Sequence, residues 1–295
     1  MVVACRVDRD VVRVAGPDAT AYLHGQLSQD TEALKAGDSA RSFVLQPTGK
    51  VDAWFRVTRT AADEYLLDID GGYGEGLMGR LRRFQLRTKA DIDPLDWACV
   101  VLRGPGAGDR ADAAAIPAEL RVPTDWPGAE GVDLLGPGVE LPRDPPPGVS
   151  VADHNTYEAL RISSGVPAMG AELTSKTIPG EAGAWVLDAS VSFTKGCFTG
   201  QELVARIDSR GGKVPRQLVG LTIESGTVPP QGATVYVDGN EVGAVTSSAQ
   251  ADASQRPVAL AYVRRGIEPP VGGTVAWSDG EVPVTVRTLP LGHPS

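Results

Sequence analysis

Cys197 is the residue whose surroundings in the sequence most suggest chemistry. Gly196 and Gly200 bracket it, Lys195 precedes it by two positions, and residues 201–207 have the spacing of a short amphipathic helix. A helix start favours negative charge, and a nearby cation also lowers the pKa of a thiol. The pattern therefore predicts a reactive thiolate held between two flexible glycines. The alternative is a small buried cysteine flanked by glycines that only make turns.

The other two cysteines have a different setting. Cys5 and Cys99 lie in apolar, strand-like runs, which predicts buried and inert thiols. The three cysteines are far apart and form no C-x-x-C pair, which argues against a disulfide framework and against a zinc or cluster site made by this chain alone.

The segment around Cys197 resembles a known signature. Residues 195–202 read K-G-C-F-T-G-Q-E, which is similar to the K-G-C-[YF]-x-G-Q-E motif of the YgfZ family, whose members are related to the T-protein of glycine cleavage. The resemblance covers most of the chain and is weakest over residues 105–148. The residues it marks as signature or ligand-binding are Lys195, Gly196, Cys197, Phe198, Gly200, Gln201, Glu202 and Arg206.

The resemblance implies an α+β fold of three domains around a central channel, with a C-terminal antiparallel barrel. In T-proteins this channel holds tetrahydrofolate, and the matching positions here are Asp52, Trp54, Arg161 and Ser163. Two positions depart from the T-protein pattern. Ala53 stands where the catalytic aspartate is expected, with Asp52 one position away, and Ser163 replaces the glutamate that holds the pterin ring.

These departures bear on function. Aminomethyl transfer needs a carboxylate near the reacting nitrogens, which Ala53 does not supply. A serine at 163 is also a weaker acceptor for the paired donors of a pterin than a carboxylate. The resemblance then favours an iron–sulfur cluster assembly or repair factor that acts through Cys197, has no conventional enzyme activity and is connected with tRNA modification.

Two further hypotheses stay open. One is a tetrahydrofolate-dependent aminomethyltransferase or other one-carbon enzyme, and the other is an interaction module that has lost its ligand. A single thiolate does not hold a cluster. The assembly-factor hypothesis therefore requires iron–sulfur carrier or client proteins, and the one-carbon enzyme hypothesis requires a folate-like small molecule.

Several charged and aromatic residues have two interpretations. Arg206, like the basic run from Arg80 to Lys89, either meets an anionic partner or is solvated surface charge. Glu202 either serves the site or complements the helix dipole. Trp54 either stacks on a planar ligand or packs in the core.

The elements that must position these residues are visible in the pattern. Strands are predicted at 11–14, 42–45, 51–57, 65–69 and 97–102, and helices after Asp18, at 76–86 and at 151–162 with Asp153 as cap. The proline-rich residues 105–148 allow only short elements. Two Asp-Gly hairpins after residue 220 predict the small barrel.

Length and composition limit the remaining classes. A chain of 295 residues suits two or three domains. We expect an N-terminal α+β domain at 1–100, completed by the helix and signature of 151–215, an irregular part at 101–150, and the barrel at 216–295. A net charge of −9 argues against nucleic-acid binding. The charged N-terminus and the lack of long apolar runs predict a cytoplasmic protein that no membrane holds, and we expect a monomer.

Overall fold

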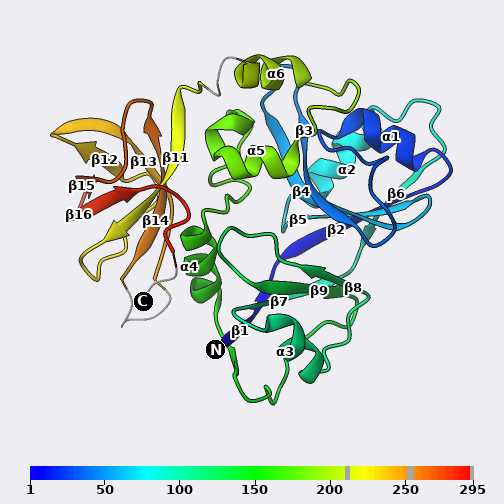
Figure 1. The fold of residues 1–295 in the computed structure, drawn as a ribbon, viewed down its shortest axis with the longest axis horizontal. Helices are drawn as coiled ribbons and strands as arrows, with labels where there is room; N and C mark the ends of the chain where they lie inside the picture. Colours follow the sequence, from blue (N-terminus) through cyan, green and yellow to red (C-terminus); the bar gives the residue numbers. More distant parts are fainter. Residues whose placement is uncertain (210–212, 251–255, 293–295) are drawn as a thin grey trace. The chain divides into compact units, whose positions relative to one another are not determined.

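The computed structural model describes residues 1–209, 213–250 and 256–292. The chain divides into two compact units (Figure 1). The barrel unit consists of residues 1–7, 99–167 and 214–295, and the signature unit of residues 8–98 and 168–213.

The signature unit is built on a five-stranded antiparallel sheet. The predicted strands are all present, and 91–95 adds an edge strand. In hydrogen-bonding order the strands are β3 (Ser39–Leu45), β4 (Val51–Ala61), β5 (Glu64–Asp70), β2 (Arg9–Ala15) and β6 (Asp91–Leu95).

A buried ion-pair network ties three of these strands together. Asp68 of β5 is fully buried and accepts hydrogen bonds from Arg56 of β4 at 2.9 Å and from Arg9 of β2 at 2.6 Å. Burial alone would raise the pKa of Asp68, but the guanidinium groups of Arg56 and Arg9 outweigh it and hold this pKa below its usual value. The centre of the sheet therefore holds buried ion pairs. Removing either partner of a pair would leave the charge of the other buried and uncompensated.

Helices accompany this sheet in the same unit. They are α1 (Ala19–Gln26), α2 (Gly74–Arg83), the 3-10 turn η1 (Pro179–Ala182), α5 (Ala184–Ser190) and α6 (Gln201–Ser209). The prediction that Asp18 caps α1 with its side chain is wrong. Asp18 occupies the N-cap position, but its carboxylate instead accepts from the backbone N–H of Lys89 at 2.7 Å, because the chain of residues 88–90 passes beside this turn.

The barrel unit begins with a second five-stranded sheet. Its strands, in order, are β10 (Val149–Val151), β1 (Val2–Val7), β7 (Ala98–Arg103), β9 (Gly131–Gly136) and β8 (Leu120–Pro123). Residues 2–7 had been expected in the N-terminal domain, but β1 pairs with β7 and β10 and so joins this unit. Residues 105–148 hold only short elements, among them α3 (Ala107–Ala113), as their prolines predict.

Helix α4 (His154–Ser164) follows and packs on the barrel. Asp153 caps it as predicted, with its carboxylate accepting from the N–H of Thr156 at 2.9 Å. The apolar side of α4, with Ala159 and Ile162, contacts Leu260 and neighbouring residues of the barrel's outer surface. The predicted segment 151–215 is thus divided, because residues 151–167 belong to the barrel unit and 168–213 to the signature unit.

The predicted C-terminal barrel is confirmed as a closed antiparallel barrel of six strands. Its core is mainly valine from the inward positions of every strand. The first hairpin turns at its predicted Asp-Gly pair, Asp238-Gly239. The second turns one residue earlier than predicted, at Ser278-Asp279, because Gly280 already pairs with Trp277 in the sheet. In order around the barrel the strands are β11 (Arg216–Ile223), β14 (Val258–Arg264), β13 (Asn240–Ala249), β12 (Thr234–Val237), β15 (Val271–Trp277) and β16 (Gly280–Arg287).

Candidate functional site

Cys197 lies on the loop between α5 and α6 of the signature unit, and its side chain is exposed. The structure describes all three cysteines, and Cys5 and Cys99 are each only 2% exposed. Burial raises the pKa of the Cys5 thiol to about 11. At neutral pH that thiol stays protonated, and Cys197 is the one of the three cysteines whose side chain is exposed.

Lys195 fixes the start of this loop. Its buried ammonium group donates hydrogen bonds to three backbone carbonyl oxygens around the C-terminal end of α1, those of His24, Leu27 (2.7 Å) and Gln29 (3.0 Å). A cation suits this end of a helix, where carbonyl groups lack intrahelical partners. The expectation that Lys195 serves as the cation for the thiolate needs correction, because its three donors are used by the backbone. Its role is to anchor the loop.

The burial of Lys195 perturbs its proton equilibrium. Loss of solvation lowers the pKa of Lys195 to about 8 from an ordinary 10.5, and the nearby charges of Asp30 and Glu32 oppose this only in part. The ammonium form still dominates at neutral pH. It is the form with three N–H donors, which matches the three carbonyl oxygens around it.

Gly200 fixes the other end of the loop. Its φ is +80°, and a Cβ there would lie 2.6 Å from the carbonyl oxygen of Gln46. The facing turn has the same requirement, since Gly49 has a φ of +76° and a Cβ on it would lie 2.5 Å from Cβ of Leu203. The turn of residues 46–50 and the start of α6 are therefore in backbone contact. Gly196 differs, because a Cβ there would meet nothing within 4 Å, so its expected steric role is absent.

Of the remaining signature residues, some hold the loop in place and others are exposed on the surface. Phe198 is buried, with its ring centroid 5.3 Å from Nζ of Lys195, and its backbone N–H donates to Oε1 of Gln201 at 3.2 Å. Glu202 and Arg206 are exposed on α6. Phe198 and Gln201 thus hold the turn that precedes α6, whereas Glu202 and Arg206 lie on the surface of that helix.

The expected folate residues of the signature unit make other contacts. Asp52 forms an ion pair with Arg80, Oδ2 to Nε at 3.2 Å, and Ala53 is buried. Trp54 is 4% exposed, and its indole N–H donates to Oγ of Ser190 at 2.8 Å. Trp54 is therefore a core residue here, which agrees with the second of its two interpretations from the sequence and not with stacking on a ligand.

The other two expected folate residues belong to α4 of the barrel unit. Arg161 is buried and donates to the carboxylate of Glu158, with Nη2 to Oε2 at 2.6 Å, and to the carbonyl oxygen of Val166 at 2.7 Å. Ser163 is also buried, and its hydroxyl has no hydrogen-bond partner among the described residues. Arg161 thus bonds to its own helix and to the turn that follows it, while the Ser163 hydroxyl retains unused hydrogen-bonding capacity.

Among the described residues, no group of three or more His, Cys, Asp or Glu side chains is placed to hold a metal ion. Within the same residues no helix combines the length and apolar character that a bilayer crossing needs. The signature loop itself can present one exposed thiol from a fixed backbone, which suits ligation or nucleophilic attack on a large partner.

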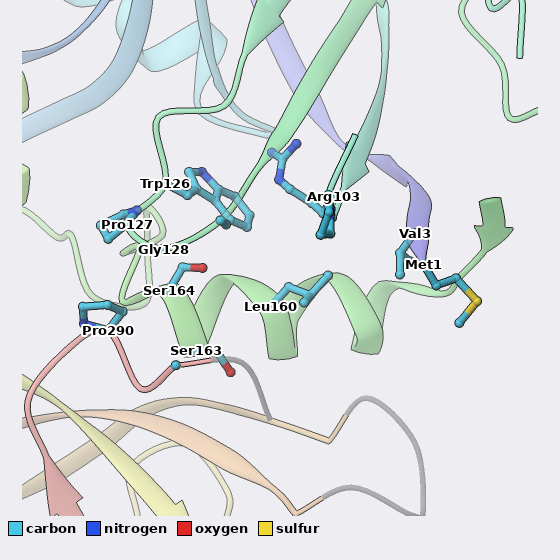
Figure 2. A pocket seen from close by; sticks show the side chains of 14 residues that line it. Met1, Val3, Arg103, Trp126, Pro127, Gly128, Leu160, Ser163, Ser164 and Pro290 are labelled. Carbon is cyan, nitrogen blue, oxygen red and sulfur yellow. The ribbon is translucent and has the colours of Figure 1, made fainter. Parts of the chain in front are cut away.

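Two structural features that bear on function were not predicted from the sequence. The first is the anchoring of Lys195, for which residues 166–171 positions away supply the carbonyl oxygens. The second is a cavity in the barrel unit lined by Arg103, Trp126 and Leu160, among others (Figure 2). An arginine at the end of the apolar strand 98–103 was the one signal in the sequence.

Comparison with known proteins identifies similar sequences and similar structures. The family model described as "Glycine cleavage T-protein C-terminal barrel domain" matches residues 216–291. An uncharacterized protein of Haemophilus influenzae is 26% identical over 201 residues, which are 68% of this chain and 66% of that protein. An aminomethyltransferase of Streptomyces avermitilis is 30% identical over 271 residues, 88% of this chain and 66% of that enzyme.

The structural comparison extends over nearly the whole chain. The crystal structure of the glycine cleavage system aminomethyltransferase T from Bartonella henselae matches with a TM-score of 0.79 at 20% identity, covering 98% of this chain and 86% of that one. At this identity the likeness shows a shared fold. The chain spans just under two thirds of the length of each of the two relatives described above.

Proposed function

Because the chain belongs to the YgfZ/GcvT family of glycine cleavage T-protein relatives, we propose that it is a folate-binding-type protein that assists iron–sulfur cluster assembly or repair through Cys197. Its clients would be iron–sulfur enzymes, including those of tRNA modification. The observation that carries the proposal is the exposed thiol on a loop whose two ends are fixed by Lys195 and Gly200.

This geometry suits a thiol that works on another protein. A buried thiol such as Cys5 is inaccessible to a carrier, and its pKa of about 11 keeps it protonated. Cys197 is exposed, and its backbone is held on one side by the ammonium of Lys195 and on the other by the contact between Gly200 and the turn at Gln46. The sulfur is thus presented at a defined position, which limits the entropy lost on docking.

The proposed step is a ligand exchange on a cluster that is cargo. The Cys197 thiol releases a proton to solvent, its sulfur forms a bond to iron, and the thiolate that leaves the iron takes up a proton. No electron is transferred. Since a cluster is held by several ligands, the carrier or client protein, or a small thiol, supplies the others.

The alternative is a one-carbon enzyme that uses tetrahydrofolate, and the residues fit it less well. Ala53 has no carboxylate, Asp52 is paired with Arg80, and Ser163 offers one hydroxyl where a bidentate acceptor is needed. Calorimetric titration with tetrahydrofolate tests this alternative. Tight binding that is lost in Asp52→Asn would favour the enzyme, and we expect no such loss.

A deletion strain provides the test of the main proposal. In cells that lack this protein, wild-type chain restores the activity of iron–sulfur enzymes, and Cys197→Ser is expected to restore almost none of it. Cys5→Ala is the matched control, because it removes a buried thiol and should complement like wild type. Full complementation by Cys197→Ser would contradict the proposed role.

Alkylation of the folded protein checks the chemical premise separately. With iodoacetamide at neutral pH, the native wild type should take up one label, and Cys197→Ser should take up none until it is unfolded. Labelling of Cys5 or Cys99 at a comparable rate would show that exposure does not distinguish Cys197.

A further inference from the structure

The end of α2 and the turn that follows it form a basic surface on the signature unit, which the proposed function does not use. Residues 82–89 read R-R-F-Q-L-R-T-K, and we refer to them as the basic turn. The turn lies between α2 and β6, both of which Figure 1 labels. It contains no acid, and its cations are all exposed, namely Arg82, Arg83, Arg87 and Lys89. This local positive charge contrasts with the net charge of −9 of the whole chain.

Two large apolar side chains are exposed within the basic turn. Phe84 is 41% exposed and Leu86 is 82% exposed. The other exposed large apolar side chains in the described part of the chain stand singly in the sequence, and single ones need no explanation. A run of charge alone is most simply solvated surface. Apolar side chains with a charged rim instead have the composition of a protein interface.

The backbone of the basic turn is fixed at its far end. The N–H of Lys89 donates to the carboxylate of Asp18 at 2.7 Å, and the N–H of Asp18 donates to the carbonyl oxygen of Lys89 at 3.2 Å. This close approach depends on Gly16, where a Cβ would lie 2.5 Å from the same oxygen. The side-chain amide of Gln85 also donates to the carbonyl oxygen of Ala90. The turn therefore presents its exposed side chains from a fixed backbone.

The exposed ring of the basic turn is ordered before any partner arrives. The guanidinium carbon of Arg80 lies 3.9 Å from the ring centroid of Phe84, and that of Arg83 lies 5.9 Å from it. Arg80 is itself held by its ion pair with Asp52. Further along, Arg87 has a φ of +58°, which residues other than glycine rarely adopt. An ordered ring on a backbone that the fold holds in this conformation loses little entropy when a partner docks.

The composition of the basic turn restricts the chemistry of its partner. Exposed cations favour carboxylates or phosphates, and the exposed side chain of Leu86 favours an apolar group. A nucleic acid supplies phosphates, but it leaves Leu86 in water, and the net charge of −9 repels a long polyanion beyond the turn. An anionic bilayer is subject to the same repulsion over a larger area. A short acidic protein segment with apolar residues satisfies both requirements.

We propose that the basic turn is a docking site for an acidic protein segment, whose carboxylates pair with the cations of the turn while an apolar side chain packs against Phe84 and Leu86. The charges steer the encounter, and burial of apolar surface supplies more of the affinity, because exposed ion pairs contribute little. The site uses no residue of the signature loop, so it is independent of the role proposed for Cys197.

A designed peptide tests the site without knowledge of the natural partner. The probe is E-D-E-L-F-D-E-E-E with blocked ends, titrated into the full chain and followed by calorimetry. It should bind with a dissociation constant on the order of 10 µM and weaken about tenfold between about 50 and about 200 mM salt. The peptide E-D-E-S-S-D-E-E-E keeps the charge without the apolar pair and should bind about tenfold more weakly. The peptide K-R-K-L-F-K-R-K-K has the opposite charge and should not bind.

Two double variants test whether the charge acts locally. Arg83→Glu/Arg87→Glu reverses two cations of the turn and should weaken the probe at least about tenfold. Lys35→Glu/Lys176→Glu is the matched control, because it makes the same change in net charge at exposed positions of the same unit, and it should weaken the probe less than about twofold. Circular dichroism checks that both variants fold.

Three single variants test the apolar part of the site. Leu86→Ser should weaken the probe about fivefold and leave the salt dependence of binding unchanged. Phe193→Ser is the matched control, because it removes an exposed apolar side chain elsewhere on the same unit, and it should bind the probe like wild type. Cys197→Ser should also bind like wild type, which separates this result from the function proposed for the signature loop.

Several results would overturn the proposal. Among the peptides they are no binding of the probe, or equal binding of the peptide that lacks the apolar pair. Among the variants it is an equal loss in the lysine control. Tighter binding of an oligouridylate or of phosphatidylglycerol vesicles would assign the turn to a nucleic acid or a membrane. A dimer in sedimentation that Arg83→Glu/Arg87→Glu dissociates would assign it to a second copy of the chain. The comparison among the peptides needs no variant, so it holds even where a substitution disturbs folding.

Discussion

Lys195 and Cys197 are two residues apart, yet their side chains have opposite environments. The ammonium of Lys195 is buried among three carbonyl oxygens, whereas the thiol of Cys197 is exposed. The anchored side chain of Lys195 fixes the loop from which the side chain of Cys197 extends. A change at Lys195 should therefore appear as a loss of stability, and through the moved loop as a loss of function.

Replacing Lys195 by Met tests the anchor. At pH 7 the variant should lose about 2 kcal/mol of unfolding free energy, because three carbonyl oxygens lose a charged donor, while the relief of burying that charge offsets part of the loss. Urea unfolding followed by circular dichroism measures the difference. Lys176→Met, an exposed change in the same unit, is the control and should stay within about 0.5 kcal/mol.

The pH dependence of that difference has a definite sign. The pKa of Lys195 is about 8 in the folded chain against an ordinary 10.5, so between these values the unfolded state binds more protons. The wild type should therefore gain stability relative to Lys195→Met as pH rises from 8 to 10.5, by up to about 3 kcal/mol. A difference that shrinks in this window would mean that the carbonyl bonds hold the folded pKa above its ordinary value.

At the scale of elements, the backbone conformation of the loop between α5 and α6 depends on Gly200 and not on Gly196, the other glycine of the signature. Gly200→Ala should lower the unfolding free energy by about 3 kcal/mol, since the residue has a φ of +80° and its Cβ would lie 2.6 Å from a backbone oxygen of Gln46. Gly196→Ala is the matched control, with open space around its Cβ, and should stay within about 0.5 kcal/mol. Equal effects in thermal melts would contradict this distinction.

The elements themselves were largely predictable from local pattern. Short apolar runs bounded by turn residues indicated β2 to β5, and Asp153 indicated the start of α4, because these signals lie within a few positions of the structure they encode. Asp18 shows the limit. It stands at a helix start, but Lys89, which is 71 positions away, donates to its carboxylate.

The site was predictable only in part, for the same physical reason. The contrast between Cys197 and Cys5 follows from local polarity and was visible in the sequence. The contacts of Lys195 with α1, the burial of Trp54 beside Ser190, and the stacking of Arg103 on Trp126 all join distant segments. No periodicity within one segment encodes such contacts.

At the scale of the molecule, each unit is assembled from separated stretches of chain. The barrel unit takes residues 1–7, 99–167 and 214–295, so most of it cannot be excised as one piece. The six-stranded barrel is the exception, because its strands are consecutive from Arg216 to Arg287. Closure also removes free strand edges, which otherwise promote aggregation.

The fragment of residues 214–292 should therefore fold by itself. Its core of buried valines, among them Val235, Val275 and Val286, is internal to the barrel and needs no other segment. We expect a β-type circular dichroism spectrum and a cooperative thermal transition below that of the full chain. The transition is lower because without α4 the outer side chains of Leu260 and Tyr262 become exposed.

Two fragment variants separate the inner core from the outer face. Val275→Asp places a charge in the fully buried core and should abolish the cooperative transition. Tyr262→Thr changes only the surface that α4 covers in the full chain, so it should leave the transition in place and reduce the tendency of the fragment to associate. If the wild-type fragment shows no cooperative transition, the barrel core is not sufficient for folding without α4. The smallest part of this unit that folds would then include more than the six-stranded barrel.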